Sequence, residues 1–338
     1  MIKEKKNYQI NIGMAFGIII AALFMVAPLF SGAQMQMTGL EDDVSIEIIP
    51  KYPGSNENVI VRIDGATTDM SRAEMTWVLN DKIILKGVGQ ESINFKTSSA
   101  GSVSYINLII RTKDGGVINK DIVITPADVV LLWEAKTYTP PFYKGKALNS
   151  PESGVMITAM PNIIGSDGKK IPSKDLVYKW KVRDGIDSRN SGLGKNTYAI
   201  ISEKVQAPVL IELEVKSFDE RITAEGSVYL RIAEPKILIY KNDPLLGTLF
   251  NQAVGDAVDF KGEEMTLRAE PYFFSTDSMA KRDLEYSWKM NGKIFETENN
   301  KIILRGGGEQ RGTSKFSINI NNARKIFQRA ESAFLVNF

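Results

Sequence analysis

The chain has 338 residues, with 42 lysines and arginines against 40 aspartates and glutamates, and it has neither histidine nor cysteine. This balance argues against nucleic acid as the main partner, because no stripe of basic residues with interleaved aromatics appears. Without histidine or cysteine there can be no Ser-His or Cys-His nucleophile, no histidine metal site and no disulfide. We therefore expect a non-enzyme whose domains are held together by their cores alone.

The first predicted element, residues 1–33, is a signal peptide or an N-terminal membrane anchor. A basic start precedes the uncharged run from Ile12 to Phe30, and residues 31–33 (Ser-Gly-Ala) suit a signal-peptidase cut before Gln34. The apolar run of about 19 residues nearly spans a bilayer at ~1.5 Å per residue, so an uncleaved transmembrane helix with lysines inside is the alternative. Both readings predict an extracytoplasmic protein, either anchored to the cell membrane or secreted.

Three similar units follow, each marked by a tryptophan in the same local sequence. Trp77, Trp180 and Trp288 lie at intervals close to the length of one β-sandwich domain. Before and after each tryptophan come runs in which apolar residues alternate with polar ones, and this period predicts strands with one buried face. We expect all three tryptophans to be structural core residues, and the chain to be all-β.

The unit boundaries are predicted at two prolines. Pro126 and Pro235 each stand between the last strand-like run of one unit and the first run of the next. The predicted domains are 44–126, 127–235 and 236–338. Because no flexible linker intervenes, we expect a semi-rigid rod of three tandem sandwiches. The only plausible helical turn is Asn322 to Ser332.

These residues resemble tandem immunoglobulin-like modules of the PKD (polycystic kidney disease) type, which occur on prokaryotic surfaces. The family signature is an aromatic-x-Trp-x-apolar-x-Asp-Gly strand and turn, which residues 178–185 match best, residues 286–292 in part and residues 77–81 loosely. The family's Phe-Gly-Asp-Gly turn is not intact anywhere. The resemblance implies β-sandwiches used for adhesion, spacing or assembly, with no catalytic residues.

The loop after Trp180 offers the best candidate for a metal site; Asp114 and Asp121 in the first unit are more scattered. Asp184, Asp187 and Asn190 place oxygen atoms in a glycine-bearing loop, and calcium prefers six to eight oxygen ligands. The spacing does not fit an EF-hand, and Arg189 brings an unfavourable charge. A polar hairpin loop without metal is the alternative, and no other cofactor is expected.

Two aromatic clusters are candidate binding surfaces. The first runs from Trp133 to Tyr143, and the second is Tyr272, Phe273 and Phe274. Exposed aromatic side chains stack on sugars or anchor protein partners, whereas buried ones would fill the joints between sandwiches. For the first cluster, at the first-to-second junction, the sequence favours a joint. For the second, which lies inside a unit, the joint is also favoured, but less strongly, and an exposed binding surface stays the alternative.

The sequence thus predicts a non-catalytic envelope protein, exported and released or membrane-anchored, that works by adhesion, protein–protein contact or assembly scaffolding. Its expected partners are envelope or extracellular proteins, and the membrane through the N-terminal segment. The alternative is an array of carbohydrate-binding modules that uses exposed aromatics.

Overall fold

A computed structural model describes residues 44–204, 207–297, 299–306 and 311–338. The predicted signal or anchor, residues 1–33, lies outside the described residues. Within the described ranges, no helix is long and apolar enough to cross a membrane.

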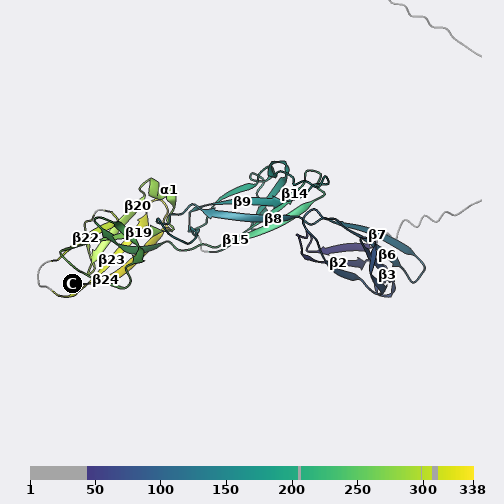
Figure 1. Ribbon diagram of the computed structural model, residues 1–338, viewed down its shortest axis with the longest axis horizontal. Coiled ribbons are helices and arrows are strands. Elements are labelled where there is room, and N and C mark those ends of the chain that lie inside the picture. Colours follow the sequence, from purple (N-terminus) through teal and green to yellow (C-terminus); the bar gives the residue numbers. More distant parts are fainter. Residues whose placement is uncertain (1–43, 205–206, 298, 307–310) are drawn as a thin grey trace, which may run out of the picture. The chain divides into compact units, whose positions relative to one another are not determined.

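The described chain is all-β, and its six sheets come in pairs from three consecutive segments (Figure 1). In the first sheet pair, one sheet has the order β1-β2-β5 and the other β4-β3-β6-β7. The strands of this pair are β1 (Val44–Ile49), β2 (Asn58–Gly65), β3 (Glu74–Leu79), β4 (Lys82–Val88), β5 (Ser92–Lys96), β6 (Ser104–Arg111) and β7 (Val117–Ile124).

The second sheet pair repeats this plan. Its sheets have the orders β13-β9-β8 and β11-β10-β14-β15, with β12 also paired to β10. The strands are β8 (Asp128–Ala135), β9 (Gly154–Asn162), β10 (Val177–Val182), β11 (Gly185–Ile186), β12 (Gly192–Leu193), β13 (Thr197–Ile201), β14 (Val209–Lys216) and β15 (Thr223–Leu230).

The third sheet pair has the orders β17-β16-β19-β22 and β18-β24-β23-β20-β21, and β18 lies parallel to β24. The strands are β16 (Lys236–Asp243), β17 (Gly247–Ala253), β18 (Ala257–Asp259), β19 (Glu264–Tyr272), β20 (Leu284–Met290), β21 (Lys293–Phe295), β22 (Lys301–Arg305), β23 (Thr313–Asn322) and β24 (Arg329–Asn337). Short helical turns are η1 (Met70–Arg72), η2 (Ser173–Asp175) and α1 (Thr276–Ala280).

Pro126 lies between β7 and β8, and Pro235 lies between β15 and β16. The chain therefore changes sheet pair at both prolines. That each pair folds as a separate domain with the predicted boundaries stays a prediction.

Each sheet pair encloses a core centred on one tryptophan. Trp77 on β3 and Trp180 on β10 are 0% exposed, and Trp288 on β20 is 1% exposed. In each pair the indole Nε1–H donates to a backbone carbonyl of the loop that follows the hairpin. The acceptors are Gln90 at 2.8 Å, Lys195 at 3.0 Å and Asn299 at 3.2 Å. The three indoles are thus buried with their one polar group satisfied, which makes this burial favourable.

The turn after each tryptophan strand is also the same. The third and fourth residues after each tryptophan have positive φ, as a two-residue type I′ hairpin turn requires. These residues are Asn80 and Asp81, Arg183 and Asp184, and Asn291 and Gly292. The turn fixes the register of the tryptophan strand against its hairpin partner.

The helical turn predicted for Asn322 to Ser332 is wrong, because β23 ends at Asn322 and β24 begins at Arg329. The side-chain Oδ1 of Asn322 accepts the backbone N–H of Arg324 and Lys325, as a helix cap would. The N–H of Gln328 then bonds to the carbonyl of Lys325, which closes a tight turn. A cap is present, but the chain returns directly into a strand.

Replacing Trp180 should destabilise the second sheet pair, and the loss of stability should depend on how much of the side chain is removed. For Trp180→Ala we expect the free energy of unfolding to fall by about 3–5 kcal/mol, because a large cavity is left. Trp180→Phe loses chiefly the hydrogen bond to Lys195, and we expect a fall of roughly 1–2 kcal/mol. Urea unfolding followed by circular dichroism measures both. Trp133→Phe, at a half-buried position, is the control; a loss as large as that of Trp180→Ala would contradict this ranking.

Candidate functional site

The aromatic cluster Tyr272, Phe273 and Phe274 is not an exposed binding surface. These side chains are 4%, 2% and 0% exposed, so they do not offer the exposed rings that the alternative of a sugar or partner surface requires. Phe274 belongs to the core around Trp288. Tyr143, from the segment after β8, packs edge-on against Tyr272 and Phe273, with ring centroids 5.5 and 6.1 Å apart. The hydroxyls of Tyr240 and Tyr272 bond to each other at 2.6 Å beneath this contact.

The segment that begins at Lys136 runs along the end of β19 in the third sheet pair. The N–H of Tyr138 donates to the carbonyl of Phe274, and the N–H of Phe273 donates to the carbonyl of Tyr138, both at 2.7 Å. Thr137 and Ser275 form an isolated antiparallel bridge. The segment from Trp133 to Tyr143 therefore contributes Tyr138 and Tyr143 to a junction, as predicted, but to that of the second and third sheet pairs and not to the first-to-second junction that the sequence indicated. Phe142, by contrast, is 89% exposed.

A buried carboxylate lies at this junction. Glu270 on β19 is 1% exposed; it accepts the hydroxyl of Tyr138 at 2.9 Å and forms an ion pair with Arg268. Burial, and then the charge of Glu270, raise the pKa of Tyr138 far above its usual value and that of Tyr286 to about 12. Both hydroxyls therefore stay protonated at neutral pH, and Tyr138 remains a donor to the carboxylate.

A second contact runs in the opposite direction, from the third sheet pair to the second. Gln328, in the turn before β24, is 0% exposed. Its Nε2 donates to the carbonyl of Pro151 at 2.8 Å and to Oγ of Ser150 at 3.3 Å. Its Oε1 accepts the N–H of Ser275 and Nδ2 of Asn322, each at 3.0 Å. Every donor and acceptor site of this amide is used, which a fully buried amide requires.

Polar contacts join the first and second sheet pairs. Asp128, at the start of β8, accepts the N–H of Ser55 at 2.7 Å and its hydroxyl at 2.5 Å. The N–H of Ala127 donates to the carbonyl of Pro53, and that of Gly101 to the carbonyl of Pro126. Charge and backbone hydrogen bonds dominate here, in contrast to the aromatic packing at the other junction.

The predicted calcium ligands Asp184 and Asp187 lie in the loop region after β10. Asp184 lies on the exposed turn between β10 and β11. Asp187 accepts hydrogen bonds from the backbone of Arg189 and Asn190, from Nδ2 of Asn190 at 2.9 Å and from the hydroxyl of Tyr198 at 3.0 Å. Its carboxylate oxygens thus organise the loop. Across the described ranges, no three acidic, histidine or cysteine side chains gather as a metal site would need.

The sequence carried little signal for Glu270 and Gln328. Alternation along β19 places Glu270 on the polar face, which in an isolated sandwich would be solvated. Gln328 stands in a short turn among charged residues, and nothing near it indicates burial. Both are buried because a segment far away in the chain covers them.

The chain matches no family model and no curated protein. Among solved structures it is similar to the three N-terminal domains of the bacteriophage RB49 Highly Immunogenic Outer Capsid protein, at 12% identity over 87% of this chain and 97% of that chain, with a TM-score of 0.27. It is also similar to the central fibronectin-III array of RIM-binding protein, at 10% identity over 86% of this chain and 95% of that one, with a TM-score of 0.30.

A third similar structure is the SGBP-B of the Bacteroides ovatus mixed-linkage glucan utilization locus, in complex with a mixed-linkage heptasaccharide. It is 11% identical, over 88% of this chain and 70% of that chain, with a TM-score of 0.19. At such scores the likeness identifies no family, partner or activity.

Removing the side chain of Gln328 should loosen the junction. Gln328→Ala leaves the carbonyl of Pro151 and the N–H of Ser275 without their partner, and we expect a loss of roughly 2–3 kcal/mol in the free energy of unfolding. Hydrogen exchange should accelerate at Ser275 and Thr276. The exposed Gln252→Ala is the control and should leave both unchanged. Unaltered exchange in Gln328→Ala would show that the amide does not hold the junction.

Asp187 should stabilise the second sheet pair in a pH-dependent way. Its hydrogen bonds, that from Asn190 first, lower the pKa of the folded carboxyl. The stabilisation is therefore present above the unfolded pKa of about 3.9 and is lost as the pH falls through the lower folded value. We expect Asp187→Asn to lower the melting temperature at pH 7, and the difference from the parent to shrink below about pH 4.

Asp184→Asn, on the exposed turn, serves as the control for this effect. Calcium chloride should not raise the melting temperature of the parent. If calcium raised the melting temperature of the parent but not that of Asp187→Asn, Asp187 would be a calcium ligand, and the proposal that it only organises the loop would be wrong.

Proposed function

We propose that this chain is a non-catalytic exported protein, anchored to the membrane or secreted, whose consecutive sandwiches hold and contact other envelope or extracellular proteins. The observation that supports this best is the junction of the second and third sheet pairs. Its buried polar groups, Glu270 and Gln328, are occupied by contacts between the two pairs. Such contacts fix one module against the next, as a spacer or scaffold requires.

One pair of side chains at the junction has the composition of a nucleophilic site. Nζ of Lys325 donates to Oγ of Ser275 at 2.8 Å, and burial lowers the pKa of Lys325. A serine paired with a lysine of lowered pKa can act as a nucleophile. Ser275 is only 1% exposed and lies in the bridge to Thr137, so a substrate could not reach its hydroxyl without opening the junction. This arrangement favours a structural role.

Carbohydrate binding loses its support from the aromatic cluster of β19, because those rings are buried. Replacing Tyr272 by alanine should destabilise the junction rather than remove a sugar contact. Protein contact therefore remains the better proposal.

The proposal predicts that the chain, crosslinked in exporting cells, co-purifies with envelope or extracellular proteins from outside the cytoplasmic membrane. It also predicts no change in melting temperature with cell-wall or plant polysaccharides, and the same crosslinks in Gln252→Ala as in the parent. Recovery of the chain from the cytoplasm, or a polysaccharide that raises the melting temperature, would contradict the proposed function.

A further inference from the structure

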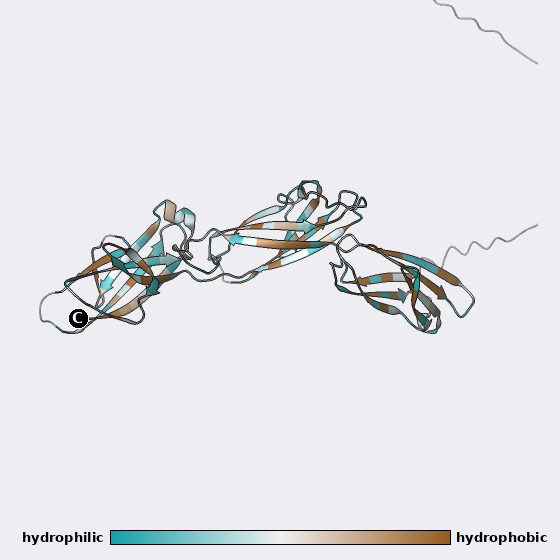
Figure 2. Cartoon of the chain, viewed as in Figure 1, coloured by the Kyte–Doolittle hydropathy of each residue, from teal (hydrophilic) through white to brown (hydrophobic). Residues whose placement is uncertain are grey.

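The outer face of the sheet β13-β9-β8 carries exposed apolar side chains, as does the sheet β4-β3-β6-β7 of the first pair, where Ile83, Tyr105 and Val123 are 61%, 61% and 59% exposed. Val130 and Leu132 on β8, Met160 on β9 and Ile201 at the end of β13 are 56%, 53%, 55% and 73% exposed. The register places Val130 opposite Met160, and Met156 opposite Ala199, so these side chains share one face. Figure 2 shows the apolar stretch of β8 in brown. We call these six residues the apolar face.

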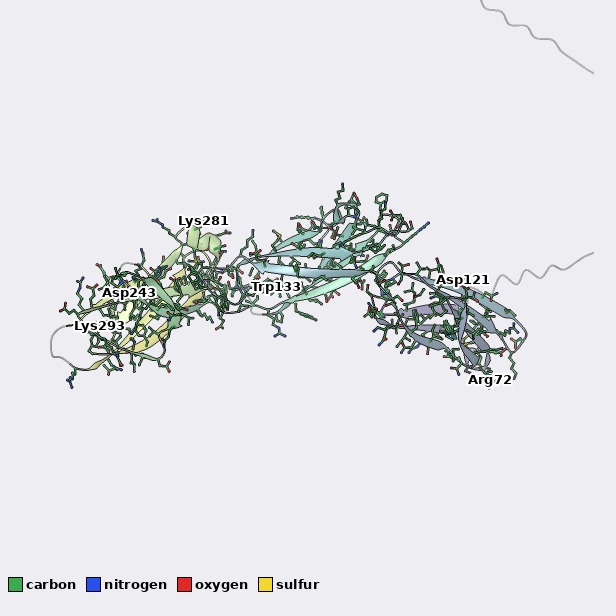
Figure 3. All side chains as sticks on the ribbon, in the orientation of Figure 1. Arg72, Asp121, Trp133, Asp243, Lys281 and Lys293 are labelled. Atoms are coloured by element: carbon green, nitrogen blue, oxygen red, sulfur yellow. The ribbon has the colours of Figure 1, made fainter. Side chains whose placement is uncertain are left out.

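The remaining outward positions of this sheet are the polar residues Asp128, Glu134, Thr158, Asn162 and Thr197, together with Gly154, and the inward face is already packed. Leu132 stands opposite Thr158, and Glu134 opposite Met156. The alternate residues of β8 point to the core; Trp133, labelled in Figure 3, packs against it and is covered by Nζ of Lys146 at 3.2 Å from the ring centroid. The exposed residues therefore contribute nothing to the core of the second sheet pair.

The equivalent sheet of the first pair, β1-β2-β5, shows that this composition is not demanded by the fold. Its outward positions are mostly polar, with Glu47 opposite Arg62 in a salt bridge, and Ile49 opposite Ile60 as the apolar exception. The other outward residues are Ser45, Asn58, Asp64, Ser92, Asn94 and Lys96. Large apolar patches on a surface mark places of contact.

A groove of about 1000 Å³ opens at the Ile201 end of the apolar face. Gly154, opposite Ile201, has no side chain and leaves a hollow there, while Asp277 and Lys325 of the third sheet pair line the groove with Lys136 and Lys204. The groove thus joins the apolar face to a rim of charged groups.

The charges of this rim favour an anionic ligand. Its charged side chains are four cations and three carboxylates: Lys136, Lys204, Arg324, Lys325, Glu152, Glu203 and Asp277. Glu203 is paired with Arg183 at 2.6 Å, and Arg324 is paired with Asp283 at 3.1 Å. Nζ of Lys325 already donates to Oγ of Ser275 and interacts with Asp277 and Glu152, so Lys136 and Lys204 are the cations that face an incoming ligand. A carboxylate that enters the groove would gain lysine contacts, most strongly at low salt.

We infer that the apolar face and its groove bind a protein segment that carries apolar side chains followed by carboxylates. The apolar side chains cover Val130, Leu132 and Met160, and the carboxylates reach Lys136 and Lys204. This inference rests on the proposed function, since it names the site and the kind of partner for the same protein contact.

The test uses the chain purified from an exporting host and two fluorescein-labelled peptides of alternating leucine and serine. One ends in two aspartates and its twin ends in two lysines. By fluorescence anisotropy at low salt, the acidic peptide should bind about tenfold more tightly. Leu132→Glu and Met160→Glu should weaken its binding by about tenfold or more, because each variant would bury a charge on contact. Lys204→Glu should remove the preference for the acidic end.

Asn94→Glu, at an outward position of the first sheet pair, is the matched control and should bind as the parent does. The variants sit at exposed positions, so their melting temperatures should equal that of the parent. Equal binding of the two peptides, no binding of either, or the same loss in Asn94→Glu would overturn the inference. So would a concentration-dependent dimer in sedimentation velocity that Leu132→Glu abolishes, because a second copy would then cover the face.

Failure of this site can be told apart from failure of the proposed function. A photo-crosslinking residue at Leu132 is compared in cells with one at Phe218, which is 79% exposed on another surface. Crosslinks from Phe218 alone, together with no peptide binding, overturn the site and leave the protein-contact function standing. Absence of crosslinks from both positions counts against the function as well.

Discussion

The burial of one tryptophan in each sheet pair, with its indole N–H bonded to a loop carbonyl, is the interaction on which the rest of the structure depends. The chain has no cysteine, so no disulfide can join the two sheets of a pair. An indole reaches from one sheet across the core and also ties down the loop after the hairpin. Because the same contact recurs three times, strand register and hairpin turn recur with it.

The junction of the second and third sheet pairs follows a different physical rule. Glu270 and Gln328 would be costly to bury alone, since an unpaired buried amide or carboxylate loses its hydration. They are tolerated only because Tyr138, Arg268 and the backbone of Pro151 satisfy them. Such contacts have strict geometry, so they specify one arrangement of neighbours more sharply than apolar packing does.

Local pattern was sufficient for the strands but not for the junction. Alternation located β2, β6 and β14, and the repeated tryptophan sequence located the hairpins, because both signals lie within a few residues. Tyr272 and Phe273 pack against Tyr143, which is about 130 residues away and joined to them by no periodicity. The turn at Asn322 misled for a related reason: its cap is a local helix signal, and long-range pairing of β23 with β24 overrides it.

Repetition within one chain also separates what the fold needs from what a function could use. All three sheet pairs share the tryptophans and the turns after them. These shared positions are needed to stabilise the fold of each pair. The outer faces of the equivalent sheets are not needed for the fold, and their composition differs. The face carries a salt bridge in the first pair and exposed apolar residues in the second, and in the third it is covered by aromatic packing at the junction. An exposed apolar face stabilises nothing within its own sandwich and increases the risk of aggregation. On the second module this face also borders a groove lined by lysines, and a protein partner that covers both would remove that cost.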